Sequence, residues 1–315
     1  MSETLDLSRL RVCVVMNRGS GRGKEKRLRG QIEDALKPRC AHFEIRPTTR
    51  GSDLTDMARQ AVGDGFGLII ACGGDGTQSA VAGALAGTEA VMGILPGGTF
   101  NYFARDLGVG ETIEDALETI CNGCARPIDI GQIENLIFLN NVSLGAYPHI
   151  LKTRESIYKR WGRSRIAAYW SVLVALRRLR HPMQLKARVN GDTRDVTTAL
   201  VFVARSAYQL DNFGLEGADA IRQGKFALLI AKALKPMPLI RSALRLAFGF
   251  SARNSDFDLI ETDEVTIESR KHRMLVAHDG EKTVMASPFR LRVWHDGLQV
   301  LLPADGVSKT RDNGG

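Results

Sequence analysis

Short apolar runs alternate with helical patterns through the first third of the chain. Four runs rich in β-branched residues predict strands at residues 11–16, 42–46, 68–72 and 91–95. Around them, apolar residues recur with the spacing of one helix face, which predicts helices at residues 24–36, 53–62, 77–86, 100–107 and 112–122. This alternation is typical of an α/β domain with a mainly parallel sheet, whose loops gather at the carboxyl edge where such folds bind ligands.

From about residue 129 the pattern changes to short runs with alternating apolar and polar residues. These runs predict strands of an antiparallel β domain at residues 136–140, 185–189, 197–204, 226–231, 264–269, 274–277 and 291–294. Two basic helical segments interrupt them, at residues 163–180 and 238–250. We therefore expect an α/β domain over residues 1–128, a β domain over residues 129–305 and a disordered polar tail over residues 306–315.

Composition and cysteine content indicate in which cellular compartment the protein works. With 315 residues, 44% of them hydrophobic, the chain is long enough for two domains with cores of their own. It has no apolar run of about 18 residues and does not begin like a signal peptide, so we expect a cytoplasmic protein. The five cysteines cannot all pair, which fits a reducing compartment. Cys121 and Cys124 lack the second pair or nearby His of a zinc site, so we assign no metal ligands.

The charge distribution favours an anionic partner. The chain has 43 basic and 35 acidic residues, a net charge of +8, which suits nucleotides, nucleic acid or acidic lipid headgroups. Residues 18–29 carry six Lys or Arg, and residues 152–180 carry nine, interleaved with aromatic residues. Charge alone does not choose among these partners. Because no nucleic-acid-binding module is recognisable, we do not expect nucleic acid to be one of them.

The most informative segment is GGDGT at residues 73–77, which follows a predicted buried strand and precedes a predicted helix. Glycines permit positive φ angles and let backbone N–H groups approach a polyphosphate, while the helix N-terminus adds partial positive charge. Asp75 would repel phosphate unless it meets Mg²⁺, a ribose hydroxyl or a substrate proton. The alternative is a tight turn in which Asp75 only caps the helix.

Two further loops follow predicted strands. Residues 95–108 read LPGGTFNYFARDLG, and this loop would form the opposite wall of a nucleotide cleft, although PGGT is also an ordinary turn with a Thr cap. Residues 17–24 read NRGSGRGK, one residue short of a Walker A motif and without its final Ser or Thr. Its glycines do not fit a dinucleotide fingerprint either. We interpret it as an anion-binding turn, with solvated basic residues as the alternative.

Taken together, these motifs resemble a known family. The chain is similar to the diacylglycerol kinase and sphingosine kinase superfamily in five motifs and their order. They are an Asn turn with Ser-Gly, GGDGT, GTFNYFAR, FLNNVSLG at residues 138–145 and DGE at residues 279–281. The resemblance spans about residues 11–303. It implies an NAD-kinase/diacylglycerol-kinase-like α/β domain, an antiparallel β-sandwich domain, and transfer of the γ-phosphoryl group of ATP to a lipid hydroxyl at a membrane surface.

The resemblance also implies the site residues. ATP, arriving with Mg²⁺, would be bound by Asn17, Ser20, Gly21, Thr48 (or Thr49), Gly73, Gly74, Asp75, Gly76, Thr77, Gly98, Thr99 and Asn101. Asp279 and Glu281 would face the γ-phosphate. The attacking hydroxyl needs a proton acceptor, for which Asp279 is the first candidate and Asp75 the rival. Without the resemblance, Asp279 and Gly280 read as a hairpin turn.

The chain departs from the family pattern in three places. Arg18 replaces the usual Pro of the first loop, and Tyr102 stands where many relatives have Asp. Where bacterial relatives often carry an Asp-Asp-Gly stretch that helps to hold a structural Mg²⁺, this chain has residues 222–224, Arg-Gln-Gly. We therefore do not expect that second metal site.

The lipid and membrane expectations rest on the resemblance and on two segments. Residues 160–180 place Trp161, Tyr169 and Trp170 among arginines, the composition of an interfacial helix, and residues 232–253 are similarly basic. We expect peripheral attachment to the inner face of an anionic membrane, with helices that merely pack between domains as the alternative. The acceptor lipid and the choice between monomer and homodimer stay open. Other functions to test are an NAD kinase and a non-catalytic lipid-binding protein.

Overall fold

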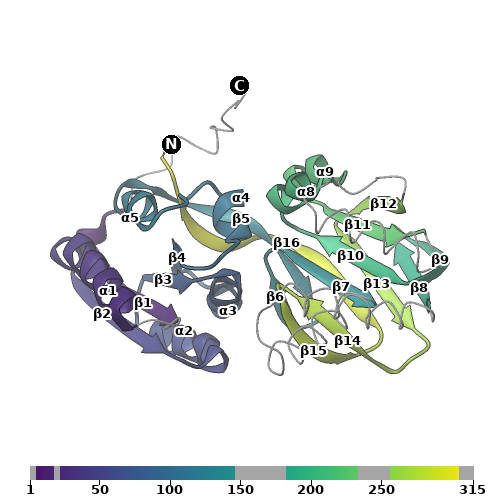
Figure 1. The fold of residues 1–315 in the computed structure, drawn as a ribbon, viewed down its shortest axis with the longest axis horizontal. Helices are drawn as coiled ribbons and strands as arrows, with labels where there is room; N and C mark the ends of the chain where they lie inside the picture. Colours follow the sequence, from purple (N-terminus) through teal and green to yellow (C-terminus); the bar gives the residue numbers. More distant parts are fainter. Residues whose placement is uncertain (1–4, 18–21, 146–181, 233–255, 305–315) are drawn as a thin grey trace. The chain divides into compact units, whose positions relative to one another are not determined.

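The computed structural model describes residues 5–17, 22–145, 182–232 and 256–304 (Figure 1). They form two compact units, unit 1 (Met1–Ile130 with His295–Gly315) and unit 2 (Gly131–Trp294). The sequence prediction placed all of residues 129–305 in the second domain. The difference at the C-terminal end arises because Gln299 and Val300 pair in parallel with Val91 and Met92 of unit 1.

Unit 1 contains a parallel sheet with the strand order β2-β1-β3-β4. Its strands are β1 (Arg11–Asn17), β2 (His42–Thr48), β3 (Leu68–Gly73) and β4 (Val91–Pro96). The end of β16 (Phe289–Leu302) continues the sheet beside β4. Strands β3 and β4 are buried on both faces, as expected for apolar β-branched runs in a parallel sheet.

Helices cover both faces of this sheet (Figure 1). They are α1 (Arg22–Leu36), α2 (Leu54–Gly63), α3 (Asp75–Leu85), α4 (Tyr102–Asp106) and α5 (Ile113–Asn122), with short 3₁₀ turns at Leu7–Arg9, Lys37–Arg39 and Gly51–Asp53. Helices α1 and α5 share one core with alternate residues of β1 and β3. Helices α2 and α3 pack against each other. Helix α4 begins later than predicted because Asn101 has a left-handed backbone, with φ of 50°.

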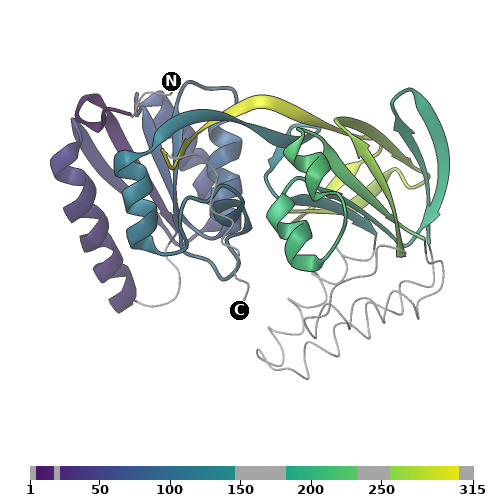
Figure 2. The same ribbon diagram turned by 90° about the horizontal axis from the view of Figure 1, so that it is seen from above.

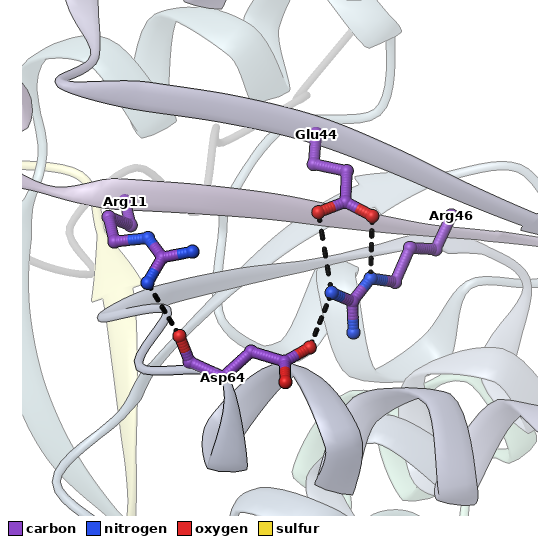
Figure 3. Close-up of polar contacts among 4 residues, drawn as sticks. All are labelled: Arg11, Glu44, Arg46 and Asp64. Carbon is purple, nitrogen blue, oxygen red and sulfur yellow. Dashed lines mark hydrogen bonds and ion pairs between the residues drawn. The ribbon is translucent and has the colours of Figure 1, made fainter.

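A charged network holds the edge strand β2 to the end of α2 (Figure 3). The Arg46 guanidinium lies 2.9 Å from the Glu44 carboxylate and 2.6 Å from that of Asp64. Arg11 donates a hydrogen bond of 2.6 Å to the Asp64 carbonyl oxygen. Both guanidinium groups also lie over the Phe66 ring, at 4.6 and 5.2 Å from its centre. The network lies along the edge of the sheet and includes none of the residues predicted to bind ATP.

Unit 2 consists of two packed sheets. One has the order β12-β11-β10-β7-β14-β15, and the other contains β13, β8 and β9, part of β16, and β5 with β6. The strands are β5 (Cys124–Ile133), β6 (Leu136–Phe138), β7 (Asn141–Gly145), β8 (Met183–Val189), β9 (Asp192–Thr198), β10 (Leu200–Ala204), β11 (Phe226–Ala231), β12 (Phe257–Thr262), β13 (Glu264–Ser269), β14 (Arg273–His278) and β15 (Glu281–Ala286). Residues from both sheets, including Phe138, Phe226 and Phe289, form the core between them. The expected α/β domain with an antiparallel β-sandwich-like domain is confirmed.

Two short helices cover part of one sheet of unit 2 (Figure 2). Helices α8 (Ala207–Phe213) and α9 (Ala218–Arg222) pack with Ala204 of β10 and with Ala227 and Leu229 of β11. The predicted helical segments 163–180 and 238–250, and the tail 306–315, lie outside the described residues. Within the described ranges, no helix is long and apolar enough to cross a membrane.

Candidate functional site

The loops after β3 and β4 touch each other backbone to backbone. Gly97 donates a hydrogen bond of 2.9 Å to the carbonyl oxygen of Gly73. A methyl group on Gly98 would lie 2.7 Å from the Cα atom of Gly74, and one on Gly74 would lie 3.0 Å from Cα of Gly98. None of these glycines has a positive φ angle. Close contact between the loops, and not a positive φ angle, therefore explains why these positions are glycine.

Asn101 closes the second loop on itself. Its side-chain oxygen accepts a hydrogen bond of 2.9 Å from Gly98 N, and its amide nitrogen donates one of 3.0 Å to Gly98 O. Asn101 makes no side-chain cap for α4. Instead, Asp75 Oδ1 accepts a hydrogen bond of 3.2 Å from Phe103 N, in the first turn of α4. Asp75, the first residue of α3, therefore connects the two glycine loops.

The first two strands bring further predicted residues to the same edge of the sheet. Asn17 and Thr48 are register partners at the ends of β1 and β2, which favours Thr48 over Thr49. Asn17 Nδ2 donates a hydrogen bond of 3.2 Å to Thr77 Oγ1. The Thr48 hydroxyl accepts from Arg50 N at 3.0 Å, so it shapes its own turn. Ser20 and Gly21 lie outside the described residues.

Sequence reasoning missed Gln78, which is completely buried directly after the GGDGT segment. Its Nε2 donates a hydrogen bond of 3.2 Å to the carbonyl oxygen of Gly73. Its Oε1 is buried without a hydrogen-bond partner. A polar residue inside the apolar pattern of α3 was the signal that could have identified it.

The edge of unit 1 has the chemistry of a polyphosphate site. At the N-terminus of α3, Thr77 N donates a hydrogen bond of 2.9 Å to the carbonyl oxygen of Gly74. The helix dipole makes this end positive, and the backbone N–H groups of a first helical turn are the usual groups that bind anions. Gly76 lies in that turn, and Thr99 is exposed on the facing loop. Next to Thr99, the Phe100 side chain is 59% exposed and stacks on Tyr102 with ring centres 5.4 Å apart. Most of the predicted ATP-binding residues that the structure describes therefore share one edge.

In unit 2, Asp279 and Gly280 form the turn between β14 and β15. Their φ angles are 44° and 85°, the pattern of a type I′ hairpin, and His278 pairs with Glu281 across it. The Glu281 side chain is exposed. The prediction of a hairpin turn at Asp279 and Gly280 is therefore correct. The turn explains the backbone conformation, and the role of the Asp279 carboxylate has to be judged from its contacts.

Asp279 is 8% exposed, and its carboxylate lies against the backbone at the start of β7. It accepts hydrogen bonds from three consecutive backbone N–H groups, those of Leu139 at 2.7 Å, Asn140 at 2.8 Å and Asn141 at 3.0 Å. Asp279 N in turn donates to the Asn141 carbonyl oxygen at 3.0 Å. These three bonds hold the carboxylate in one orientation.

His278, which sequence reasoning did not single out, lies next to this carboxylate. Burial lowers the pKa of its imidazole, although the charges of Asp279 and Glu281 oppose that shift. Its Nε2 lies 3.1 Å from the Thr283 hydroxyl oxygen. Because the pKa falls below its usual value of 6.5, His278 is neutral at pH 7.

The side chains around residues 222–224, where we do not expect a structural metal site, do not fit a cation. Arg222 ends α9, and its guanidinium lies 2.5 Å from the Asp211 carboxylate and 2.9 Å from that of Asp219. A side-chain cation therefore already neutralises both acids. Among the described residues, no group of three His, Cys, Asp or Glu side chains is arranged to hold a metal ion.

Comparison with known proteins agrees with this geometry. The diacylglycerol kinase catalytic domain matches residues 11–133, and the YegS C-terminal NAD kinase beta sandwich-like domain matches residues 150–302. The chain is 29% identical to the diacylglycerol kinase of Bacillus subtilis (strain 168) over 276 residues, 86% of this chain and 89% of that protein. It is 34% identical over 137 residues to a diacylglycerol kinase of Staphylococcus aureus, 42% of each chain. A crystal structure of a Bacillus anthracis diacylglycerol kinase has the same fold, with a TM-score of 0.67 and 20% identity over 94% of this chain and 98% of that one.

Proposed function

Because the chain belongs to the diacylglycerol kinase superfamily of lipid kinases, we propose that it transfers the γ-phosphoryl group of ATP to a lipid hydroxyl at a membrane surface. The oxygen of that hydroxyl forms a bond to the γ-phosphorus as the bond to ADP breaks, and the hydroxyl proton passes to a carboxylate. Such a transfer depends mainly on positioning and on neutralising charge. The carboxylates and loops described above are suited to both tasks.

The observation that carries the ATP half of the proposal is the contact between the two glycine loops. Gly74 and Gly98 approach so closely that a methyl group on Gly98 would overlap the Gly74 backbone, and the α3 N-terminus begins at this contact. Backbone N–H groups and a helix N-terminus are the usual partners of phosphate oxygens. Mg²⁺ arriving with ATP would neutralise phosphate charge, and Asp75 is the carboxylate in these loops that would hold it.

For the proton acceptor we favour Asp279 over Asp75. The three N–H groups at the start of β7 keep the Asp279 carboxylate in one orientation, so little reorganisation is needed when the proton arrives. Asp75 is committed to the amide of Phe103 and so connects the loops of the nucleotide site. Glu281, two residues after Asp279, is exposed and is the second carboxylate that we assign to the transfer.

Attachment to the inner face of a membrane is the part of the proposal that rests on sequence. The net charge of +8 and the basic aromatic segment 160–180 support it. That segment lies outside the described residues. We propose a cytoplasmic enzyme that binds anionic lipid surfaces reversibly, as a monomer or a homodimer.

The test is a screen with radiolabelled ATP over vesicles that contain diacylglycerol, monoacylglycerol, ceramide, a sphingoid base or phosphatidylglycerol, with NAD as a separate acceptor. We expect label in a lipid and none in NAD. Asp279→Asn should lose at least about a hundredfold in rate, because a general base contributes on the order of 10²–10⁴. Asp263→Asn is the matched control, since Asp263 is an exposed acid of the same unit.

Several outcomes would refute parts of the proposal. No labelled lipid from the parent protein would leave a non-catalytic lipid-binding protein, and label in NAD alone would leave an NAD kinase. Full activity of Asp279→Asn would move the base to Asp75, which Asp75→Asn would then test. Urea unfolding of each variant shows whether a loss of activity is a loss of fold.

A further inference from the structure

Gln78 interrupts the apolar inner face of helix α3. Val81, Ala82 and Leu85 are buried on that face, and Gln78 occupies the same face one turn earlier, with an exposed fraction of 0%. Helix α3 packs against β3 and β4, so an apolar residue is the ordinary choice at such a position. Natural proteins depart from this rule mostly at functional sites.

Stability does not explain the glutamine. Its Oε1 atom is buried and, in the part of the chain that the structure describes, has no hydrogen-bond partner. A buried acceptor left in this state lowers the stability of the folded protein. A leucine or methionine of similar length would occupy the same place without that loss. The reason for glutamine therefore lies in the other half of its amide group.

The amide nitrogen of Gln78 binds a carbonyl oxygen that both glycine loops share. Gln78 Nε2 donates a hydrogen bond of 3.2 Å to Gly73 O, and the reverse amide orientation would set oxygen against oxygen. The same Gly73 oxygen accepts a hydrogen bond of 2.9 Å from Gly97 N. A carbonyl oxygen has two lone pairs, so both donors can be accommodated. One atom thus joins α3, the end of β3 and the loop after β4.

Two other side chains in the first turn of α3 also bind neighbouring segments. Asp75 Oδ1 accepts a hydrogen bond of 3.2 Å from Phe103 N, and Thr77 Oγ1 accepts one of 3.2 Å from Asn17 Nδ2. Gln78 follows these two residues directly and is the one that acts on the contact between the glycine loops. The motif that positions the loops is therefore one residue longer than GGDGT.

We propose that Gln78 is a positioning residue of the nucleotide site, which fixes the Gly73 carbonyl group and so keeps the two glycine loops in the arrangement that binds the phosphates. The proposal rests on the proposed function and deepens it, because it assigns a residue to phosphate affinity. Gln78 itself is fully buried and touches neither substrate. Since the phosphates are held both before and during transfer, its loss should weaken ATP binding without slowing the chemical step.

The experiment measures the binding of ATP and of inorganic tripolyphosphate, each with Mg²⁺, to the parent protein and to Gln78→Leu by calorimetry. The variant should raise both dissociation constants about 3–10-fold, because one hydrogen bond that holds the loops is lost. The factor should be equal for the two ligands, since the effect is on the phosphates and not on the base or ribose. In the lipid phosphorylation assay, KM for ATP should rise while kcat and KM for the lipid stay at the parent values.

Stability should change in the opposite direction to affinity. The urea midpoint of Gln78→Leu should equal or exceed that of the parent, because the unmatched oxygen is removed and Gly73 O keeps its bond from Gly97 N. Gln60→Leu is the matched control, since it makes the same exchange at an exposed position of α2 and should keep the parent dissociation constants. Gln78→Met, which is unbranched and of similar length, takes the place of Gln78→Leu if the leucine variant does not fold.

Amide hydrogen exchange gives a readout that needs no ligand. Without nucleotide, the amides of residues 97–101 should exchange about 3–10-fold faster in Gln78→Leu than in the parent, because the loop after β4 is held less firmly. The amides of α5 should exchange at the parent rate, since this helix packs in the core that α1, β1 and β3 share.

The outcomes separate this proposal from the proposed function. Parent dissociation constants in Gln78→Leu overturn the proposal, and so does a lower urea midpoint with unchanged affinity, which would make Gln78 a purely structural residue. A larger dissociation constant for ATP but not for tripolyphosphate also overturns it. Failure to phosphorylate any lipid refutes the proposed function, whereas the two dissociation constants still decide the role of Gln78. A parent protein that binds neither ATP nor tripolyphosphate refutes both.

Discussion

The contact between the glycine loops leads to a strong prediction for Gly98→Ala. The added methyl group would lie 2.7 Å from Cα of Gly74 and 2.8 Å from Oδ1 of Asn101. Carbon atoms in normal contact are about 3.5–4.0 Å apart, so the overlap with Gly74 is about 1 Å. Because the atom that it meets belongs to the backbone, no side-chain rotation relieves it.

The cost follows from the two contacts. Overpacking of this size costs about 1–3 kcal/mol. Displacing Asn101 Oδ1 also weakens its 2.9 Å hydrogen bond with Gly98 N, worth about 0.5–1.5 kcal/mol. The unfolding free energy should therefore fall by roughly 1.5–4.5 kcal/mol. Catalysis should fall by about 10–100-fold, because a displacement near 1 Å moves the phosphate-binding loop.

Urea unfolding and ATP-dependent lipid phosphorylation measure these two effects. Gly30→Ala is the control, because Gly30 lies inside α1 with no atom within 4 Å of the added methyl group. It should stabilise the protein by about 0.5–1 kcal/mol and leave the rate unchanged. A Gly98→Ala variant with the stability and ATP dependence of the parent would show that the loops are not in contact.

Three further predictions concern charge and pH. Arg222→Ala should lower the unfolding free energy by no more than about 1 kcal/mol, because the Arg222 side chain and its Asp211 partner are each about half exposed. EDTA should not change the melting temperature of the parent protein. A lower melting temperature in EDTA would reveal a structural metal. Burial lowers the pKa of His278, so the stability contributed by its neutral form is present above about pH 6.5 and is lost as pH falls, and His278→Gln should flatten that part of a urea stability profile. Burial raises the pKa of Cys13 and Cys72 to about 12, so the unfolding free energy should fall as pH rises from 9 towards 12. At pH 8 both thiols should resist a thiol reagent until urea unfolds the chain. Rapid labelling of the native protein would contradict their burial.

Much of unit 1 was predictable because its signals are local. The predicted strand at residues 68–72 lies within β3, and the predicted helix at residues 77–86 overlaps α3, since apolar runs and glycine loops there act over neighbouring residues. Unit 2 was harder to predict. The run at residues 197–204 divides into the end of β9 and β10, with Ala199 between them, because pairing with distant strands sets where each strand ends.

The candidate site divides in the same way. The place of Gly73 and Gly74 at the edge of the sheet could be predicted, because they directly follow a predicted strand. The loop after β4 was predicted only to lie nearby. That the two loops touch, and that this contact explains the glycines, became clear only from the structure. Gln209 of α8, whose side chain accepts a hydrogen bond from Asn141, could not have been found, because 68 residues of sequence separate the two. A side chain recruited through tertiary packing leaves no periodic signal in the sequence.

Asp279 shows why a local pattern can support two interpretations that are both correct. Asp-Gly favours a type I′ turn, and the turn forms. A residue that served the turn alone could be Asn and could lie in solvent, because Asn-Gly suits the same geometry. Instead the Asp279 carboxylate is buried against three N–H groups of residues 139–141, where an amide in place of one carboxylate oxygen would oppose donor to donor. The turn thus explains the backbone of Asp279, while the three N–H groups of residues 139–141 explain why its side chain is a carboxylate.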